Sequence, residues 1–277
     1  MSSLPRFTAT EYLQPLREGG SLPAVLDTDG GLFVAKFRAA GQGPRALIAE
    51  VVVGLLAVEL GLPVPEIAEI VVPHGLAADQ RDPEIRELVE GSAGSNIGLR
   101  YLDGAFNFDA RAAGEFISAE LAAAIVWLDA YTTNPDRTAR NPNLLIWDRR
   151  PWLIDHGSAL YAHHAWDSTD DERTRTSFPL IRNHVLLLHA ADLAHTDERL
   201  GAQLEGDTVA RVVAGVPDDL LMDPLARGAF GSAGEARDRY RRYLVRRLEP
   251  PRAFVAEAAR AQTERRAGKP RRLEARR

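Results

Sequence analysis

Cysteine is absent from the 277 residues of this sequence, and lysine is almost absent. Without cysteine there is no disulfide bond, no thiolate metal site and no cysteine nucleophile. Only Lys36 and Lys269 are lysines among the 34 basic residues, and the rest are arginines. No uninterrupted apolar run approaches the ~18 residues of a membrane helix, and the first residues lack the pattern of a secretory signal. We therefore expect a cytoplasmic globular protein with no membrane partner.

Charge of one sign is not in large excess either. The net charge is −5, so attraction of the whole molecule to nucleic acid is not indicated and we expect no nucleic-acid partner. Residues 269–277 are basic, and we expect them to form a disordered, solvated tail. The length is sufficient for one large domain or two parts with sizeable cores.

The first hundred residues are dominated by β-strand patterns. Apolar runs at 23–26 and 32–37 flank an Asp/Gly-rich turn, which predicts a hairpin. Residues 65–72 predict a further strand, and a short helix is expected near 11–17. The Gly- and Ser-rich residues 94–98 are expected to form a loop near a ligand, although such clusters are also typical of ordinary turns.

A lysine and a glutamate stand out in this first part because both lie among apolar residues. Lys36 is in the second strand of the hairpin, and residues 45–60 predict a helix that is apolar on nearly all sides. Glu50 and Glu59 point to opposite sides of that helix, so only one can face Lys36, and Glu50 is nearer the helix start. A buried carboxylate needs a cationic partner, which favours a Glu50–Lys36 pair. The alternatives are an exposed Lys36, and a Glu50 that reaches solvent or pairs with Arg45.

From about residue 115 the pattern becomes helical. Residues 117–131 predict a buried helix that ends at a polar loop containing Asp136. Together with the β-rich first part, this predicts an α+β fold with two lobes. Further helices are expected at 180–193, 198–214, 234–248 and 252–266.

A β-hairpin is expected within the helical part. Short apolar runs at 144–147 and 152–154 flank residues 148–151, which predicts a four-residue turn. If the hairpin is centred in that turn, Asn143 and Asp155 lie almost opposite each other, ~4.5–5.5 Å apart at Cα. An amide oxygen and a carboxylate are hard ligands of the kind that Mg²⁺ takes together with phosphate oxygens. The open end of the hairpin is therefore a candidate metal site.

The order of these residues resembles the protein-kinase-like superfamily. A lysine in a strand is followed by a glutamate in the next helix, an aspartate in a loop, an asparagine before a short strand, and Asp-x-Gly after its partner strand. These are the parts of a phosphotransferase site in that superfamily. The resemblance covers roughly residues 20–195 and is strongest to the HipA-like kinases. It rests on Ala46-Leu47-Ile48-Ala49-Glu50, Asn134-Pro135-Asp136-Arg137 and Ile154-Asp155-His156-Gly157.

The resemblance implies a two-lobed, protein-kinase-like fold with ATP and Mg²⁺ as cofactors. The β-rich N-lobe, residues 1–102, would bind the nucleotide, and the helical C-lobe, residues 103–268, would carry the catalytic loop and the hairpin. Residues 101–104 would connect the lobes, and Tyr101 is a candidate nucleotide contact there. Residues 269–277 would be the disordered tail.

The resemblance also implies roles for individual residues. Lys36 would contact the ATP phosphates, and Glu50 would orient Lys36. Asp136 would be the catalytic base that positions the acceptor hydroxyl, and Arg137 or Arg140 could neutralise charge on the moving γ-phosphoryl group. Such a set is chemically sufficient, because phosphoryl transfer depends mainly on positioning and charge stabilisation.

Two positions compete as the second metal ligand beside Asp155. In most kinases the metal-binding asparagine lies five residues after the base, which here is Asn141. The expected hairpin register favours Asn143 instead, and Asn141 remains the alternative. The middle residue of Asp-x-Gly is His156 rather than phenylalanine.

The sequence departs from the kinase pattern in other ways. No G-x-G-x-x-G motif is present, and Gly19-Gly20-Ser21 and Gly41-Gln42-Gly43 are the candidates for a phosphate-covering loop. The chain is also shorter than a full HipA toxin, so we expect neither the toxin role nor an antitoxin partner to transfer. A non-catalytic pseudokinase or scaffold is one alternative function. A metal-dependent hydrolase is a remote one, with candidate ligands Asp155, His156, His163, His164 and Asp167.

The resemblance implies a hydroxyl group as the phosphoryl acceptor, with Ser or Thr of a protein as the first candidate. Lipid and metabolite acceptors remain open. Residues 159–177 occupy the place of an activation or substrate loop, and we expect them to be mobile and open to autophosphorylation. The candidate hydroxyls are those of Thr169, Thr174, Thr176 and Ser177.

Overall fold

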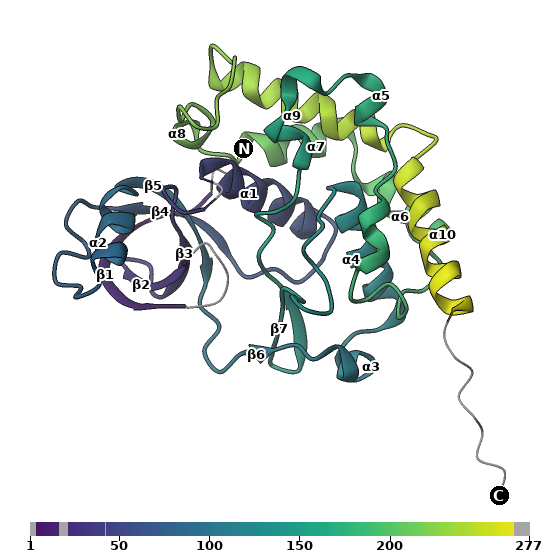
Figure 1. The fold of residues 1–277 in the computed structure, drawn as a ribbon, viewed down its shortest axis with the longest axis horizontal. Helices are drawn as coiled ribbons and strands as arrows, with labels where there is room; N and C mark the ends of the chain where they lie inside the picture. The colour runs from purple at the N-terminus through teal and green to yellow at the C-terminus, as the bar shows by residue number, and fades with distance from the viewer. Residues whose placement is uncertain (1–3, 17–21, 42, 269–277) are drawn as a thin grey trace, which may run out of the picture.

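The computed structural model describes residues 4–16, 22–41 and 43–268. Both candidate phosphate-covering loops fall wholly or partly outside these residues, as does the basic tail. A closed β-barrel lies at one end of the molecule and a group of helices at the other (Figure 1). No helix in the described part of the chain is long and apolar enough to cross a membrane.

The secondary structure is mixed. The strands are β1 (Arg6–Pro15), β2 (Ala24–Thr28), β3 (Phe33–Lys36), β4 (Ile67–Val72), β5 (Gly94–Arg100), β6 (Phe106–Asn107), β7 (Leu144–Trp147) and β8 (Arg150–Leu153). The α-helices are α1 (Pro44–Glu59), α2 (Pro83–Glu90), α3 (Ala113–Phe116), α4 (Ala119–Tyr131), α5 (Asp171–Thr174), α6 (Leu193–Gln203), α7 (Gly206–Ala214), α8 (Asp218–Leu221), α9 (Ala233–Leu248) and α10 (Ala253–Ala267). Short 3₁₀ helices occupy Ala110–Ala112, Tyr161–His164, Trp166–Ser168 and Pro179–Asn183.

The barrel is formed by β1, β2, β3, β5 and β4 in that order. The β2–β3 hairpin confirms the sequence prediction, but the expected helix near 11–17 is wrong because β1 runs through Pro15. Bulges in β1 leave Ala9 and Tyr12 as its buried side chains. The pairing that closes the barrel is between β1 and β4, which are distant in sequence, so no local pattern around 11–17 indicates it.

The expected ligand loop at 94–98 is also wrong, because these residues belong to the buried strand β5. This strand lies between β3 and β4. A Cβ atom added to Gly98 would lie 2.7 Å from Cγ1 of Ile70, so the glycine permits close packing in the barrel. The amide of Asn96 donates to the carbonyls of Ser92 and Gly94. The polar composition of this stretch thus reflects satisfied buried groups.

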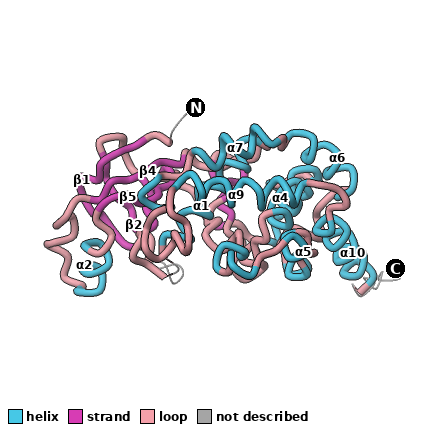
Figure 2. The backbone as a smooth tube through the Cα atoms, turned by 90° about the horizontal axis from the view of Figure 1, so that it is seen from above, coloured by secondary structure: helices cyan, strands magenta, loops and turns pink. Residues whose placement is uncertain are grey.

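Helix α1 is buried nearly all round, as its apolar sequence predicts. Its core residues form one hydrophobic cluster with the helices of the second part, whereas the barrel interior and α2 form a separate cluster. Figure 2 shows α1 between the strands of the barrel and helices α7 and α9. On the same side, Arg38 pairs with Asp223, and Ser95 Oγ lies 3.0 Å from Oδ2 of Asp219. These contacts attach the region around α8 to the barrel and hold α1 in place.

Two of the helices expected in the second part are interrupted. Instead of a helix over 180–193, a 3₁₀ turn ends at Asn183, because the amide of Val185 donates to the carbonyl of Arg137. The expected helix over 198–214 is divided into α6 and α7, which pack on different partners: α6 on α4, and α7 on α9 and α1. Helices α9 and α10 agree with the sequence prediction within one residue at each end.

Candidate active site

Lys36 lies between two carboxylates that come from different parts of the chain. Its Nζ is 2.6 Å from Oε2 of Glu50 on α1 and 2.5 Å from Oδ1 of Asp155 after β8. The side chain of Glu50 is fully buried, whereas that of Asp155 is 38% exposed. The expected Lys36–Glu50 pair is therefore formed, and the exposed side of the cluster is that of Asp155.

Neighbouring charges keep Lys36 and Asp155 ionised. Burial by itself would lower the pKa of Lys36, but the carboxylates of Glu50 and Asp155 raise it above its usual value. Burial would likewise raise the pKa of Asp155, but the Lys36 ammonium lowers it below its usual range. At neutral pH the cluster therefore presents an ammonium beside a partly exposed carboxylate.

The hairpin that carries Asp155 forms, but its register differs from the sequence prediction. Leu144 pairs with Leu153 and Trp147 with Arg150, which leaves a two-residue turn instead of a four-residue one. The turn residues Asp148 and Arg149 are both left-handed, with φ of 47° and 59°. Such a turn matches the twist of the strands and usually contains Asn, Asp or Gly followed by Gly, so Asp148 fits this preference and Arg149 does not.

Asn143 and Asp155 nevertheless meet at the open end of the hairpin. The amide of Ile154 donates to the carbonyl of Asn143 at 3.1 Å, and Nδ2 of Asn143 lies 3.5 Å from the carbonyl oxygen of Asp155. Both residues have left-handed backbones, with φ of 49° for Asn143 and 55° for Asp155. Conformations of this kind cost about 1–3 kcal/mol each and persist where the surroundings hold them.

Asp136 lies beside the same end of the hairpin. Its Oδ2 accepts hydrogen bonds from Nδ2 of Asn141 at 2.9 Å and from Nδ2 of Asn143 at 3.1 Å. Its own amide donates to Oδ1 of Asn134 at 3.1 Å. Both candidate metal asparagines thus contact the candidate base, and Asn143 is the one that also approaches Asp155.

Arg137 is not placed where a phosphoryl group could reach it. Its side chain is fully buried, and its Nε lies 2.6 Å from Oδ2 of Asp129 on α4. Its guanidinium is committed to the protein interior, so the geometry does not favour Arg137 as the residue that neutralises charge on the γ-phosphoryl group. Arg140 is exposed beside the loop and keeps its predicted role as a candidate.

The partners of Arg137 were not foreseen from the sequence. Asp129 accepts from Nδ2 of Asn134 at 3.0 Å, and its Oδ2 lies 2.9 Å from Nε2 of His184. Burial would raise the pKa of Asp129, but Arg137 and His184 lower it, so the carboxylate is charged. The sequence does contain an indication of this ion pair. Asp129 is an acid within an apolar helix, so it needs a cationic partner for the same reason as Glu50.

His156, the residue between Asp155 and Gly157, is buried in the same region. Its backbone amide donates to Oε2 of Glu50 at 2.8 Å, and its Nδ1 lies 3.3 Å from Nη2 of Arg137. Burial lowers the pKa of His156 to about 4, so the ring is neutral at pH 7. Tyr101 directly follows β5, its amide donates to the carbonyl of Leu32, and its contact with nucleotide remains a prediction.

The histidines proposed for a hydrolase site have other partners. Nδ1 of His163 lies 3.1 Å from the hydroxyl of Tyr240, and its Nε2 lies 3.2 Å from Nε2 of His164. Within residues 4–16, 22–41 and 43–268, no group of three or more His, Cys, Asp or Glu side chains could hold a metal. The hydrolase alternative therefore finds no support in the site geometry.

The buried His163 should make the protein less stable in mild acid. Burial, together with His164 and Arg45, lowers its pKa well below the usual value, and Tyr240 of α9 is its other titratable neighbour. Because only the unfolded chain protonates this histidine near its ordinary pKa of ~6.5, stability falls as the pH drops below that value. Between pH 7.5 and 5.5, we expect the free energy of unfolding to fall by about 1.4 kcal/mol more in the wild type than in His163→Asn.

Urea unfolding at the two pH values measures this difference. His195→Gln is the matched control, since the His195 side chain is 80% exposed and its removal should leave the wild-type loss unchanged. An equal loss in the wild type and in His163→Asn would contradict the assignment.

The arrangement of barrel, α1 and hairpin is that of a kinase-like fold. A crystal structure of the Helicobacter pylori proinflammatory kinase CtkA superimposes with a TM-score of 0.52 at 12% sequence identity, covering 94% of this chain and 99% of that one. At this identity the likeness concerns the fold alone.

The sequence itself identifies the family. The profile of HipA-like kinases matches residues 11–217, which is more than half of the chain. The protein belongs to the HipA-like kinase family. A comparison with curated proteins found no significant match.

Proposed function

We propose that this protein is an ATP- and Mg²⁺-dependent kinase that transfers the γ-phosphoryl group to a hydroxyl acceptor. The observation that supports this most directly is the position of Lys36, whose Nζ bridges Glu50 and Asp155 at 2.6 and 2.5 Å. A charged ammonium held by a buried glutamate and directed at a partly exposed aspartate suits the binding of phosphate and metal together. Family membership over residues 11–217 supports the same conclusion.

Asp155 and Asn143 are the residues proposed to hold Mg²⁺. Asp155 offers a carboxylate that is 38% exposed, and Asn143 offers its amide oxygen, because its Nδ2 is engaged by Asp136. This set of hard oxygen donors fits Mg²⁺, which binds one or two protein ligands alongside phosphate oxygens. When bound, the metal supplies positive charge to the phosphate oxygens. Asn141 remains the alternative second ligand.

Asp136 is the proposed catalytic base. The acceptor oxygen forms a bond to the γ-phosphorus, the bond from that phosphorus to the β–γ bridging oxygen breaks, and ADP leaves with that oxygen. The proton of the acceptor hydroxyl passes to the Asp136 carboxylate. Hydrogen bonds from Asn141 and Asn143 to Oδ2 orient the carboxylate, so that Oδ1 is the oxygen available to the acceptor. Arg140 could offset charge on the moving group.

Two measurements test the proposal. The thermal unfolding midpoint is recorded with ATP, with Mg²⁺ and with both, and phosphoryl transfer is followed with labelled ATP and protein, lipid or metabolite acceptors. We expect a rise in the midpoint that requires both ATP and Mg²⁺, and transfer to Ser or Thr of a protein. Stabilisation without transfer would favour a pseudokinase, and transfer to a lipid or metabolite would change the acceptor class. No response of the wild type to ATP and Mg²⁺ would overturn the kinase proposal.

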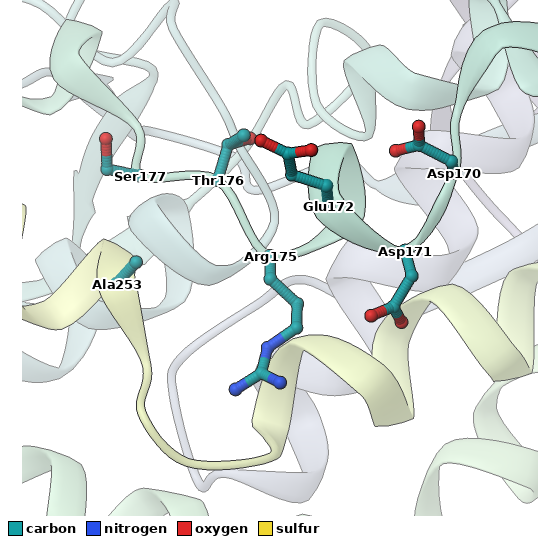
Figure 3. A pocket seen from close by; sticks show the side chains of 7 residues that line it. All are labelled: Asp170, Asp171, Glu172, Arg175, Thr176, Ser177 and Ala253. Atoms are coloured by element: carbon teal, nitrogen blue, oxygen red, sulfur yellow. The ribbon is translucent and has the colours of Figure 1, made fainter.

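If the enzyme phosphorylates itself, we predict that, of the four candidate hydroxyls in this segment, only those of Thr176 and Ser177 receive phosphate. Both residues line an open depression on the surface, shown in Figure 3. Thr169 and Thr174 are only 8% and 3% exposed, and their hydroxyls donate to the carbonyls of Ala165 and Asp170. A kinase cannot reach hydroxyls that are buried and bonded in this way without unfolding the segment.

Intact mass and peptide mapping after incubation with ATP and Mg²⁺ test this prediction, with Asp136→Asn as the inactive control. Phosphate on Thr169 or Thr174 would contradict it. An unchanged mass of the wild type would exclude autophosphorylation altogether.

A further inference from the structure

The backbones that carry the two proposed metal ligands converge on one buried guanidinium. Nη1 of Arg137 donates to the carbonyl oxygen of Asn143 and, at 3.4 Å, to that of Ile154, the residue before Asp155. Asn143 and Asp155 are the two left-handed residues at the open end of the hairpin. The guanidinium therefore contacts the backbone of both strand ends of the hairpin. At these two places the left-handed conformation directs the side chain of a proposed metal ligand.

We propose that Arg137, held by the buried carboxylate of Asp129, is a positioning residue that sets the separation of Asn143 and Asp155 and thereby the affinity for Mg²⁺. The role is indirect, because the fully buried Arg137 side chain touches neither ATP nor metal. The effect on Mg²⁺ affinity rests on the proposed kinase function. The effect of Arg137 on the hairpin end does not depend on that function.

The side of the guanidinium that faces away from the hairpin is held by a buried carboxylate. Nε of Arg137 is 2.6 Å from Oδ2 of Asp129, a carboxylate that also accepts from Asn134 and contacts His184. Asp129 lies on helix α4, within the hydrophobic cluster that α4 shares with α1. The hairpin end is thus tied to a helix that cannot shift without disturbing the core.

A third contact extends the network to the nucleotide side. Nη2 of Arg137 lies 3.3 Å from Nδ1 of His156, and the His156 amide donates to Oε2 of Glu50, which holds Lys36. One planar group therefore links the catalytic loop, the hairpin, α4 and, through His156, α1. A lysine at this position could keep the charge but could not reach these partners together, because it has one compact ammonium in place of a planar fork.

Arg137→Lys is therefore the informative variant, and Arg247→Lys is its matched control. Arg247 is also buried, and its guanidinium also donates to backbone carbonyls, those of Tyr131, Thr174 and Ala130. Those carbonyls lie outside the hairpin. Both variants exchange a buried guanidinium for an ammonium, so a general loosening of the fold would affect them alike.

The first measurement is the Mg²⁺ concentration that gives half of the ATP-dependent thermal shift, alongside the affinity for ATP in EDTA. We expect the half-saturating Mg²⁺ concentration of Arg137→Lys to be at least about 10-fold higher than that of the wild type, which is the usual effect of losing a residue that orients a metal ligand. The affinity for ATP without metal should change by less than about threefold. Arg247→Lys should match the wild type in both. Equal Mg²⁺ requirements in wild type and Arg137→Lys, or the same weakening in Arg247→Lys, would overturn the proposal.

The second measurement needs no nucleotide. Hydrogen exchange of the Ile154 amide, which donates to the Asn143 carbonyl, should become faster in Arg137→Lys and stay unchanged in Arg247→Lys. If the wild type fails to bind ATP with Mg²⁺, the kinase function fails, and the exchange of Ile154 still decides whether Arg137 holds the hairpin end. Should Arg137→Lys not fold, Asp129→Asn removes the counterion instead, and unchanged Ile154 exchange in that variant would refute the proposal.

Discussion

Asp136→Asn is expected to lower kcat for phosphoryl transfer by about 10²–10⁴-fold, the usual contribution of a positioned acid or base. The substitution keeps an oxygen that can accept from Asn141 and Asn143, so the local structure should persist. It removes the negative charge that would take the acceptor proton. Because Asp136 is not proposed to touch the nucleotide, KM for ATP should change by less than about threefold.

Steady-state kinetics with varied ATP separates these two parameters. Asp148→Asn is the matched control, since Asp148 is an exposed carboxylate in the turn of the neighbouring hairpin, and its kinetics should equal those of the wild type. A kcat in Asp136→Asn within about threefold of the wild-type value would show that this carboxylate is not the base. An equally large fall in Asp148→Asn would point to a disturbed hairpin.

Lys36→Met is expected to abolish ATP-dependent activity and to lower the free energy of unfolding by about 3–5 kcal/mol, as expected when a buried ion pair loses one partner. The reason is the environment of Glu50, which is fully buried and would lose its cation while still close to Asp155. The orphaned carboxylate, rather than the lost contact, supplies most of the effect. Lys36 is itself only 13% exposed, so water cannot replace it easily.

A double-mutant cycle identifies the origin of this loss. Lys36→Met combined with Glu50→Gln should recover part of the stability, because the neutral amide can still accept from the His156 amide. Urea unfolding of the wild type, both single variants and the double variant measures the coupling. A double variant as unstable as the sum of the two single losses would show that the Glu50 charge is not the cause.

Local sequence patterns were sufficient for much of the site. The apolar helix around Glu50 and the strand around Lys36 required a buried ion pair, and the structure forms it. The aspartate after the buried helix and the closeness of Asn143 to Asp155 also follow from short-range patterns, although the register places Asn143 opposite Ile154. Such predictions depend on the periodicity of one element and the cost of burying a charge, and both can be judged from neighbouring residues.

The failures share a different cause. Residues 11–17 predict a short helix, but pairing with β2 and with the distant β4 makes Arg6–Pro15 a strand. The Gly- and Ser-rich composition of β5 predicts a loop, but Gly98 serves a close approach to Ile70. The hairpin turn is shorter than expected because Asp148 and Arg149 both adopt left-handed conformations, which aspartate tolerates but arginine does not signal. In each case the local structure depends on a residue distant in sequence or on a backbone conformation.

By itself, the sequence determined the elements that bear Lys36, Glu50, Asp136 and Asp155, and with them the chemical character of the site. Only the tertiary structure decided how those elements meet: that Lys36 contacts Asp155 as well as Glu50, and that Arg137 turns inward to Asp129. The physical reason is that burying a charge requires a partner of opposite sign without specifying which one. The choice depends on the packing of α1, α4 and the hairpin, which no local pattern encodes.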